Sequence, residues 1–426
     1  MNIEELYNIY TKNPSVQTDT RRLQPGDLFF ALKGPNFNAN EFAKKALDAG
    51  ASYVVLDDDQ YNVEGKTILV PDVLTALQQL ALHHRHQFNI PFIGITGSNG
   101  KTTTKELIDA VLSSTFKTYT TEGNLNNHIG VPLTILKIRQ DAEIAVIEMG
   151  ANHLGEIASY CNIALPTHGL ITNCGKAHLE GFGSEEGVRK GKGELFDHLR
   201  VTQGIAFVMW DYPYLREMSN GLSHRYTYGT ADASIVGNTF APNQFLAVDF
   251  TKGFDGTIQT NLVGDYNLPN VLAAVAVGNF FKVEDEKIRA SIENYHPTNS
   301  RSQLMQKNSN QIILDAYNAN PSSMKAAIEN FAKVEGTEKI LALGAMAELG
   351  PDSLKEHMNI IKQIDRYQWK DVILVGGDFM AVDHTYRKFK SAAEAGKWLQ
   401  KFQPHNAFLL IKGSRSMQME QLLDYL

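Results

Sequence analysis

The chain has few cysteines and no long apolar run. Cys161 and Cys174 are the only cysteines among its 426 residues, and they do not form a C-x-x-C pair. This scarcity argues against a disulfide scaffold and a cysteine-based zinc site, and it fits a reducing compartment. No apolar stretch is long enough to span a membrane. Residues 1–10 include glutamates where a signal peptide would carry basic residues, so we expect a cytoplasmic protein without a membrane span.

An excess of basic residues is also missing. The 40 Lys and Arg residues are outnumbered by 47 Asp and Glu residues, which gives a formal net charge of −7. Because a nucleic-acid surface needs a basic patch, we expect no nucleic-acid partner. The chain contains neither an internal repeat nor a low-complexity tract. Its apolar content of 43% and charged content of 20% are typical of a soluble globular protein, and its length predicts two or three domains.

The most informative segment is IGITGSNGKTTTK, at residues 93–105. A buried strand expected over Ile90–Thr96 ends in a glycine-rich turn, and a helix expected over Lys101–Ser114 follows. Such a turn points backbone N–H groups and a helix N-terminus at one spot, which suits a polyphosphate, although an ordinary turn with a solvated lysine is the alternative. The pattern G-x-x-x-x-G-K-[ST] is matched except at its first glycine, where Ile95 stands. We expect nucleotide phosphates to contact Gly97, Ser98, Asn99, Gly100, Lys101, Thr102 and Thr103, with Lys101 at the β- and γ-phosphates and Thr102 on Mg²⁺.

The apolar runs divide the chain into three expected α/β domains. Residues 1–88 carry short runs around a helix-like stretch and predict a small α/β N-terminal domain. Over residues 89–298, the runs FIGIT, IAVIE, GLITN and IAFVM alternate with helical stretches and predict a central P-loop ATPase domain, with a parallel sheet covered by helices on both faces. Antiparallel strands are expected within Tyr226–Gly264. Residues 299–426 repeat the alternation in IILDA, ILALGA, VILVGG and FLLIKG, which predicts a C-terminal Rossmann-like, doubly wound domain.

Polar residues at the ends of strands and helices are candidates for further contacts. Glu148 ends the strand IAVIE, where a second Mg²⁺ ligand would lie beside the P-loop, although a plain strand-end carboxylate is the alternative. Asn126 and Asn127, in TEGNLNNHIG, offer amides to a polar substrate or belong to a surface loop. Asn267 and Asn270 are three residues apart and share a helix face, which fits either helix capping or contact with the edge of a base.

Three basic residues are harder to assign. Arg301 follows the boundary of the third domain, where an arginine from another domain can neutralise transferred phosphoryl charge, but a surface arginine is about as common. A lone histidine such as His178 is more often structural than a ligand. Lys192 would ordinarily be an exposed helix charge. The residues alone therefore leave all three roles open.

A series of strings in order resembles the Mur ligases over essentially the whole chain. The strings are TDTRRLQPGDLFFALKGPNFNANEF, GITGSNGKTTTKE, TEGNLNNHIGVP, VIEMGANHLGEI, NCGKAHLEGFGSEEG with KGKGELF, GDYNLPNVLAA, SR, DAYNANPSSM, GAMAELG and KGSRSMQME. The last four, with GNLNNHIG and MGANHLGEI, resemble the signatures of the members that use UDP-N-acetylmuramoyl-tripeptide and D-alanyl-D-alanine. Several such strings in one order are far more specific than any single one.

The resemblance implies an activity, its partners and its site residues. The reaction would be ATP-dependent amide formation through an acyl phosphate, with UDP-N-acetylmuramoyl-tripeptide and D-alanyl-D-alanine as substrates and two Mg²⁺ ions. Implied catalytic residues are Lys101, His178, Lys192 and Arg301, and implied metal ligands are Thr102, Glu148, His178 and Lys192, the last as the carbamate that several Mur ligases carry. Implied contacts are Asn267, Asn270, Arg301 and Asp315 for ATP, Thr18, Asp19, Thr20 and Arg21 for the UDP group, and Asn126, Asn127, Asn318 and Asn320 for substrate.

Three alternatives and five departures accompany this resemblance. A sister ligase or a folylpolyglutamate synthetase would share the central domain, but DAYNANPSSM and KGSRSMQME argue against both. A P-loop kinase or another NTPase explains GSNGKTT but not the third domain. A non-catalytic nucleotide sensor does not explain why Lys101, Glu148, His178 and Lys192 are all retained. The family commonly has other residues at the positions of Asn40, Lys176, Tyr266, Leu314 and Ala345.

Overall fold

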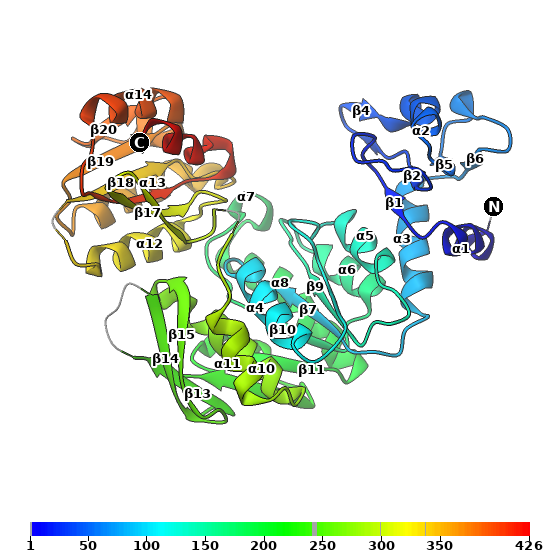
Figure 1. Cartoon of the computed structure of the whole chain (residues 1–426), viewed down its shortest axis with the longest axis horizontal. Coiled ribbons are helices and arrows are strands. Elements are labelled where there is room, and N and C mark those ends of the chain that lie inside the picture. Colours follow the sequence, from blue (N-terminus) through cyan, green and yellow to red (C-terminus); the bar gives the residue numbers. More distant parts are fainter. Residues whose placement is uncertain (1, 241–244, 299, 337) are drawn as a thin grey trace.

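The computed structural model describes residues 2–240, 245–298, 300–336 and 338–426. Within them the chain forms three large sheets of four, nine and six strands and one two-stranded sheet (Figure 1). Most strand pairs in these sheets are parallel, so the predicted α/β class is confirmed. The domain bounds 1–88, 89–298 and 299–426 stay predictions. Residue 299, where we expect the last domain to begin, lies outside the described residues. Every helix in the described ranges is too short or too polar to cross a membrane.

The N-terminal sheet is small and parallel. Its order is β1 (Val16–Gln17), β2 (Leu28–Phe30), β5 (Tyr53–Leu56) and β6 (Thr67–Leu69). Strands β2, β5 and β6 lie within the short apolar runs of residues 27–32, 51–56 and 67–70. The other elements are α1 (Ile3–Lys12), the hairpin β3 (Lys33–Gly34) and β4 (Phe37–Asn38), η1 (Ala39–Phe42), α2 (Ala43–Asp48), η2 (Asp59–Tyr61) and α3 (Val73–Arg85).

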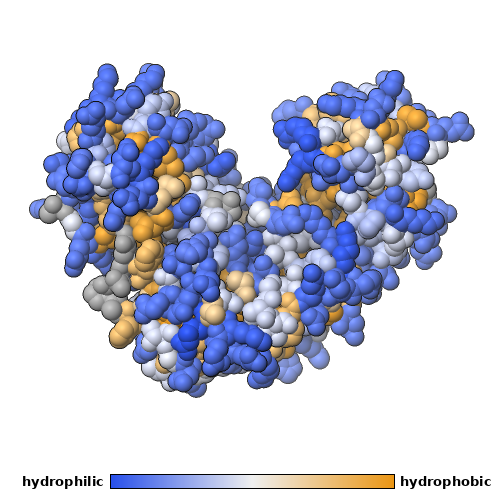
Figure 2. All heavy atoms as spheres, in the orientation of Figure 1, coloured by the Kyte–Doolittle hydropathy of each residue, from blue (hydrophilic) through white to orange (hydrophobic). Residues whose placement is uncertain are grey.

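Helix α3 joins this sheet to the rest of the molecule (Figure 1). At its C-terminal end, the buried guanidinium of Arg85 donates hydrogen bonds to the carbonyls of Phe88, Ala164 and Leu165 and stacks on the ring of Phe92. Because unpaired carbonyls at the end of a helix need donors, this arginine anchors the N-terminal domain to the central one. Further contacts join the N-terminal and central domains: the hydroxyl of Tyr10 donates to the carbonyl of Leu136, and the guanidinium of Arg139 donates to the carbonyl of Pro14. Figure 2 shows a deep hollow between the N-terminal and C-terminal domains.

The central sheet holds the P-loop strand in its middle. Its order is β15 (Gly256–Val263), β14 (Phe245–Lys252), β13 (Ile235–Thr239), β12 (His224–Gly229), β11 (Ile205–Met209), β10 (His168–Ile171), β7 (Phe92–Thr96), β9 (Ile144–Glu148) and β8 (Thr118–Thr120). The pairs β13–β14 and β14–β15 are antiparallel, as expected for this segment, and the other pairs are parallel. The chain runs from β7 to β8 and β9 on one side and then crosses to β10 on the other. Strand β7 therefore lies at a topological switch point, where ligands of such sheets bind.

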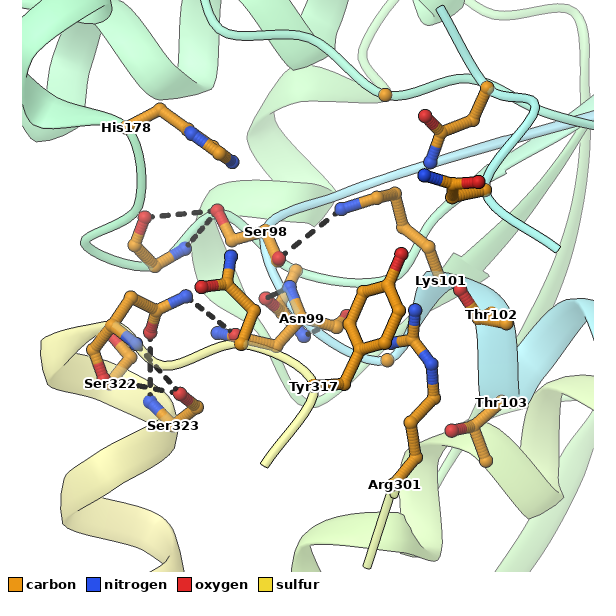
Figure 3. Close-up of a pocket in the computed structure, with 18 of the residues that line it drawn as sticks. Ser98, Asn99, Lys101, Thr102, Thr103, His178, Arg301, Tyr317, Ser322 and Ser323 are labelled. Atoms are coloured by element: carbon orange, nitrogen blue, oxygen red, sulfur yellow. Dashed lines mark hydrogen bonds between the residues drawn. The ribbon is translucent and has the colours of Figure 1, made fainter. Parts of the chain in front are cut away.

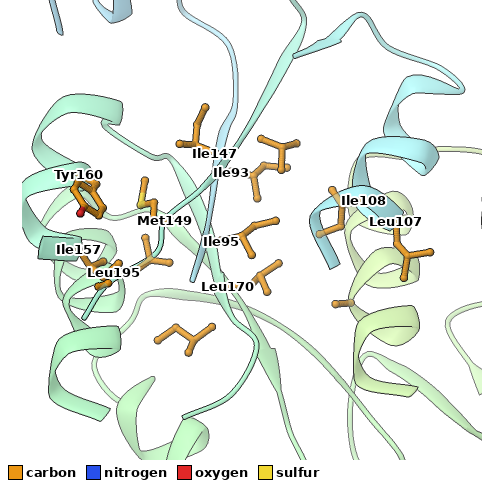
Figure 4. Packing of buried hydrophobic residues seen from close by; sticks show 14 of the residues in the cluster. Ile93, Ile95, Leu107, Ile108, Ile147, Met149, Ile157, Tyr160, Leu170 and Leu195 are labelled. Carbon is orange, nitrogen blue, oxygen red and sulfur yellow. The ribbon is translucent and has the colours of Figure 1, made fainter. Parts of the chain in front are cut away.

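Helices cover both faces of the central sheet. Figure 4 shows Ile93, Ile95, Ile147 and Leu170 of the sheet between Leu107 and Ile108 on one side and Ile157, Tyr160 and Leu195 on the other. All residues of β7 and β9 are buried, which explains their continuous apolar runs. The helices are α4 (Lys101–Ser113), α5 (Gly130–Leu136), α6 (Glu156–Ala164), α7 (Leu179–Phe182), α8 (Glu185–Thr202), α9 (Pro213–Met218), η3 (Asp265–Asn267), α10 (Leu268–Phe280) and α11 (Asp285–Glu293).

The C-terminal sheet is doubly wound, as predicted. Its order is β16 (Gln303–Lys307), β17 (Asn310–Asp315), β21 (Phe408–Lys412), β18 (Lys339–Gly344), β19 (Asp371–Val375) and β20 (Arg387–Phe389), with only β16 antiparallel. The remaining elements are α12 (Pro321–Lys333), η4 (Gly350–Asp352), α13 (Ser353–Ile364), η5 (Gly377–Met380), α14 (Ala392–Phe402), η6 (Arg415–Met417) and η7 (Met419–Tyr425). Helix α12 begins at Pro321, and Asn320, the residue before it, forms a capping box with Ser323.

One buried histidine makes the stability of the central domain depend on pH. The ring of His168 lies among Phe207, Phe280 and Phe281, and burial lowers its pKa from 6.5 to about 4. Between these values the unfolded chain binds the proton that the folded chain excludes. The contribution of His168 to the free energy of unfolding is therefore fully present above pH 6.5 and is lost as the pH falls, by about 1.4 kcal/mol per pH unit.

Urea titrations from pH 7 to pH 4 should show this slope in the free energy of unfolding. His168→Leu should make the slope shallower, because the share contributed by His168 is removed, whereas the matched exposed variant His224→Leu should keep it.

Candidate active site

The loop between β7 and α4 can be built only with glycine at two places. Gly97 and Gly100 have φ angles of +146° and +79°. A Cβ atom on Gly97 would lie 2.0 Å from Oγ1 of Thr172, and one on Gly100 would lie 2.6 Å from Oδ1 of Asn270. Both neighbours come from other elements of the central domain. The two glycines thus let the loop pack closely against β10 and α10.

The segment after β10 holds this loop in place. The N–H of Ser98 donates to the carbonyl of Asn173 at 2.8 Å, and the N–H of Asn99 donates to Oδ1 of Asn173 at 3.0 Å. Oγ of Ser98 also exchanges 3.0 Å hydrogen bonds with the backbone of Gly175. Contacts from both sides therefore fix the loop within the protein itself.

Lys101 lies over its own loop (Figure 3). Its Nζ donates to the carbonyls of Gly97 at 2.7 Å and Ser98 at 3.3 Å. Burial lowers the pKa of Lys101, the charge of Glu148 opposes that shift, and the charge of Arg301 adds to it. An anion placed here would relieve the cost of keeping this lysine charged.

Glu148 has one carboxylate oxygen without a partner. The side chain is 1% exposed, and its Oε1 accepts hydrogen bonds from Oγ1 of Thr102 at 3.2 Å and Nδ2 of Asn126 at 2.7 Å. Its Oε2 is buried and accepts none. A buried, unpaired carboxylate oxygen beside a threonine hydroxyl is the donor set that Mg²⁺ takes from proteins. In the part of the chain that the structure describes, no group of three or more His, Cys, Asp or Glu side chains is placed to hold a metal ion.

Lys192 is not the exposed helix charge that its position in the sequence suggested. It is 1% exposed, and its Nζ donates to the carbonyl of Ala151 at 2.8 Å. Burial, with the charge of Lys101 as a further cause, lowers its pKa from 10.5 to about 7. It lies behind the cavity wall, whereas Ala151 lines the cavity. A lysine with this pKa is partly neutral near pH 7, and the neutral amine is the form that combines with CO₂.

His178 points into the cavity from the start of α7 (Figure 3). Its backbone is left-handed, with a φ of +52°. Nδ1 of the ring lies 2.5 Å from Oε2 of Glu348 in the C-terminal domain, and the two groups form an ion pair when the ring is protonated. This contact lowers the pKa of Glu348. His178 therefore links two domains at the edge of the cavity.

Several of the candidate asparagines also serve the fold. Asn270 accepts from Oγ1 of Thr104 at 3.0 Å and donates to Asn267 at 2.8 Å, which fastens α10 to α4. Oδ1 of Asn127 accepts from two backbone N–H groups at the start of α5. Asn267, which precedes α10, makes no side-chain capping hydrogen bond. Oδ1 of Asn318 accepts from the next N–H. Nδ2 of Asn320 donates to Oδ1 of Asn99 across the domain boundary at 2.7 Å.

The ends of two C-terminal strands face the P-loop from the other side. Asp315, at the end of β17, accepts from Nζ of the buried Lys412 at 2.5 Å and from the N–H of Ser302 at 3.1 Å. Arg301 lies with its guanidinium carbon 3.5 Å from the centre of the Tyr317 ring. Oγ of Ser302 is 2.9 Å from the hydroxyl of Tyr266 in the central domain. The linker between the domains is thus held on both sides of Arg301.

One cavity of about 1340 Å³ joins most of the candidate residues. It is lined by Ser98, Asn99, Gly100, Lys101, Thr102, Thr103, Asn126, Asn127, Glu148, His178, Asn267, Asn270, Arg301, Asp315, Asn318 and Asn320. Gly97 and Lys192 lie just outside its wall. The cavity is not lined by the N-terminal candidates Thr18, Asp19, Thr20 and Arg21, and Asp19 pairs with the exposed Arg21 at 2.7 Å.

Sequence reasoning missed three residues that line the cavity, Tyr317, Ser322 and Lys412. Lys412 is the last residue of β21, Tyr317 follows the end of β17, and Ser322 lies in the first turn of α12. A place near the carboxyl end of a strand is the signal that could have found the first two.

The fold and the site define a class. A P-loop at the switch point of a parallel sheet, facing the strand ends of a second doubly wound domain, is the architecture of a multidomain P-loop ligase. The Mur ligase middle domain matches residues 95–278, and the Mur ligase, glutamate ligase domain matches residues 300–415. The UDP-N-acetylmuramoyl-tripeptide–D-alanyl-D-alanine ligase of Bacillus subtilis is 36% identical over 96% of this chain and 92% of that protein. The chain belongs to the Mur ligase family.

Solved structures agree with this membership. MurF from Acinetobacter baumannii is 30% identical and superposes with a TM-score of 0.87, covering 96% of this chain and 93% of that one. MurF ligase from Thermotoga maritima in complex with ADP is 27% identical, with a TM-score of 0.85 and coverage of 97% of both chains. The three-domain α/β fold expected from the sequence is therefore shared over nearly the full length of these proteins.

Proposed function

We propose that this protein is an ATP-dependent ligase that joins D-alanyl-D-alanine to UDP-N-acetylmuramoyl-tripeptide. The products would be UDP-N-acetylmuramoyl-pentapeptide, ADP and phosphate, formed in the cytoplasm for peptidoglycan synthesis. The observation that carries this proposal is the single cavity in which Lys101 of the P-loop and Arg301 of the next domain meet. The name of the Bacillus subtilis relative gives these two substrates, and the Thermotoga maritima relative binds ADP.

The chemistry begins with a carboxylate, which is a poor electrophile because its oxygen cannot leave. The tripeptide carboxylate attacks the γ-phosphorus of ATP, the bond to the β-phosphate oxygen breaks, and an acyl phosphate and ADP form. The amine of D-alanyl-D-alanine then attacks the acyl carbon. A tetrahedral intermediate expels phosphate and leaves the amide, with one proton lost from the amine.

Lys101 and Arg301 would stabilise the charge that builds on the phosphoryl group during transfer. The N–H groups of Ser98 and Asn99 already donate to Asn173, so the N–H groups at the start of α4 would hold the β- and γ-phosphates. Lys101 would turn from its own carbonyls toward these phosphates. Asn267, Asn270 and Asp315 are proposed to contact the rest of the nucleotide. The acyl phosphate is sensitive to water, so a cavity closed by contacts such as Asn99 with Asn320 has a chemical purpose.

Mg²⁺ fits the donor set around Glu148. Thr102 and the unpaired Oε2 of Glu148 would hold one ion, and His178 with a carbamylated Lys192 would serve a second. When bound, the ions would neutralise phosphate charge. A carbamate at Lys192 would turn a cation that repels metals into an anion that orients them.

The substrates would enter from different domains. We propose that Asn126 and Asn127 lie near the tripeptide and that Asn318 and Asn320 lie near the dipeptide, since all four line the cavity. The UDP group would be bound by Thr18, Asp19, Thr20 and Arg21, on the N-terminal domain across the hollow seen in Figure 2. That arrangement would require the N-terminal domain and the cavity to bind one long substrate together.

Phosphate release tests the proposed reaction directly. With ATP, Mg²⁺ and UDP-N-acetylmuramoyl-tripeptide, release should depend on D-alanyl-D-alanine, and single amino acids or glutamate should not replace the dipeptide. A preference for one amino acid would instead indicate a sister ligase. Release that needs neither the muramoyl substrate nor an amine would indicate a kinase-like or plain ATPase activity and would contradict the proposal.

Removing the P-loop lysine should stop turnover. Lys101→Ala takes away the cation nearest the transferred phosphate, and we expect kcat to fall by at least about 100-fold. The matched control is Lys117→Ala, which removes an exposed lysine beyond the end of α4. Coupled phosphate assays of both variants decide the point, and near-normal kcat in Lys101→Ala would remove the P-loop from the mechanism.

Carbamylation of Lys192 can be observed without measuring turnover. In protein equilibrated with ¹³C-labelled bicarbonate, ¹³C NMR should show a carbamate signal that is missing from Lys192→Gln. Lys190→Gln, which changes an exposed lysine two residues away, should keep the signal. An unchanged carbamate signal in Lys192→Gln would place the modification elsewhere.

A further inference from the structure

Arg301 is supported by an aromatic ring that the proposed mechanism does not use. Its guanidinium carbon lies 3.5 Å from the centre of the Tyr317 ring, and both residues line the cavity. Figure 3 shows the end of the arginine against this ring, on the side of the cavity where Lys101 lies. Stacking on a ring face leaves the N–H groups at the edge of the guanidinium available to an anion.

The backbone around Arg301 is held in an unusual conformation. Ser300 and Ser302, on either side of it, have φ angles of +55° and +48°, in the left-handed region that residues other than glycine seldom adopt. The N–H of Tyr317 donates to the carbonyl of Ser300 at 3.3 Å, and the N–H of Ser302 donates to Asp315 at 3.1 Å. The segment that follows β17 therefore fixes the linker from both sides, because such a conformation persists only where the surroundings determine it.

The positive charge of Lys101 explains why Arg301 needs a contact with the Tyr317 ring. Arg301 lies near enough to Lys101 for its charge to lower the pKa of that lysine, so the two cations repel one another. An arginine repelled in this way, at the end of a long flexible side chain, would turn toward solvent unless a contact held it. The ring provides that contact without neutralising the guanidinium, as a carboxylate would.

We propose that Tyr317 is a positioning residue that holds Arg301 over the P-loop for phosphoryl transfer. This inference rests on the proposed function, because it assigns Arg301 to the transferred phosphate. Tyr317 itself would contact Arg301 and not the reacting atoms. A different role, in which the ring stacks on the adenine base, would affect ATP binding independently of Arg301.

A double-mutant cycle separates these roles. The variants are Tyr317→Leu, Arg301→Ala and the double variant, assayed for dipeptide-dependent phosphate release at saturating ATP, with raised enzyme concentration for the slow ones. Tyr317→Leu should lower kcat about 10-fold and change the KM for ATP by less than about twofold. In the Arg301→Ala background the same change should have no further effect on kcat, because the residue on which Tyr317 acts is already missing.

Tyr317→Phe and a distant tyrosine serve as controls. Tyr317→Phe keeps the ring and should recover most of the kcat lost in Tyr317→Leu. Tyr367→Leu, a change on the outer side of the same domain, controls for general destabilisation of that domain, and melting curves should show that all variants are folded. The hydroxyl of Tyr317 would be implicated instead, against the proposal, if the phenylalanine variant were as slow as the leucine variant.

Two results would overturn the inference. Effects of Tyr317→Leu and Arg301→Ala that multiply in the double variant would show that the ring does not act through the arginine. A raised KM for ATP with unchanged kcat would assign the ring to the base. If the unaltered protein released no dipeptide-dependent phosphate, the proposed function itself would fail, and that result is distinguishable from either of these.

Discussion

The close packing of the P-loop against its neighbours is the constraint on which the site depends. Gly97 and Gly100 approach Thr172 and Asn270 so closely that no larger residue fits, and Asn173 holds the loop from the end of β10. N–H groups bind phosphate most tightly when they already point at it, because no free energy is then spent on reorienting them during binding. Because protein contacts already fix the loop, the central domain is preorganised for a polyphosphate.

Two of the positions at which we expect departures from the family pattern connect the central and C-terminal domains. Tyr266 contacts Ser302 across the boundary at 2.9 Å, and Lys176 pairs with the buried Glu356 at 2.8 Å. Asn40 lies instead within the N-terminal domain, where it exchanges hydrogen bonds with Asp57. The backbone carbonyl of Ala345 accepts a hydrogen bond from Oγ of Ser414, and its methyl side chain has no polar group to offer. The departures at Tyr266 and Lys176 thus occur where two domains meet, and each forms a contact that holds them together.

Much of the fold could be predicted because buried parallel strands leave continuous apolar runs. The strands FIGIT and IAVIE were recognisable in this way, and the glycine-rich turn before Lys101 indicated the helix that follows it. The site was harder, because a polar residue does not reveal its partner. Lys192 resembles any helix lysine until the packing of α8 shows that it is buried. Similarly, the stacking of Arg301 on Tyr317 joins residues on two separate segments, which neither segment predicts alone.

Burying several cations around one cavity costs free energy that a polyanion can recover. The pKa values of Lys101 and Lys192 are both lowered, chiefly by burial, and each is lowered further by a neighbouring positive charge. Asp315 is paired with Lys412, so that carboxylate is already engaged, whereas Oε2 of Glu148 accepts no hydrogen bond. A nucleotide triphosphate with its metal would satisfy both kinds of group at once, because phosphate oxygens suit the cations and the metal suits the free carboxylate oxygen. The same arrangement of charges therefore destabilises the protein when no ligand is bound and gives it affinity for a nucleotide triphosphate with its metal.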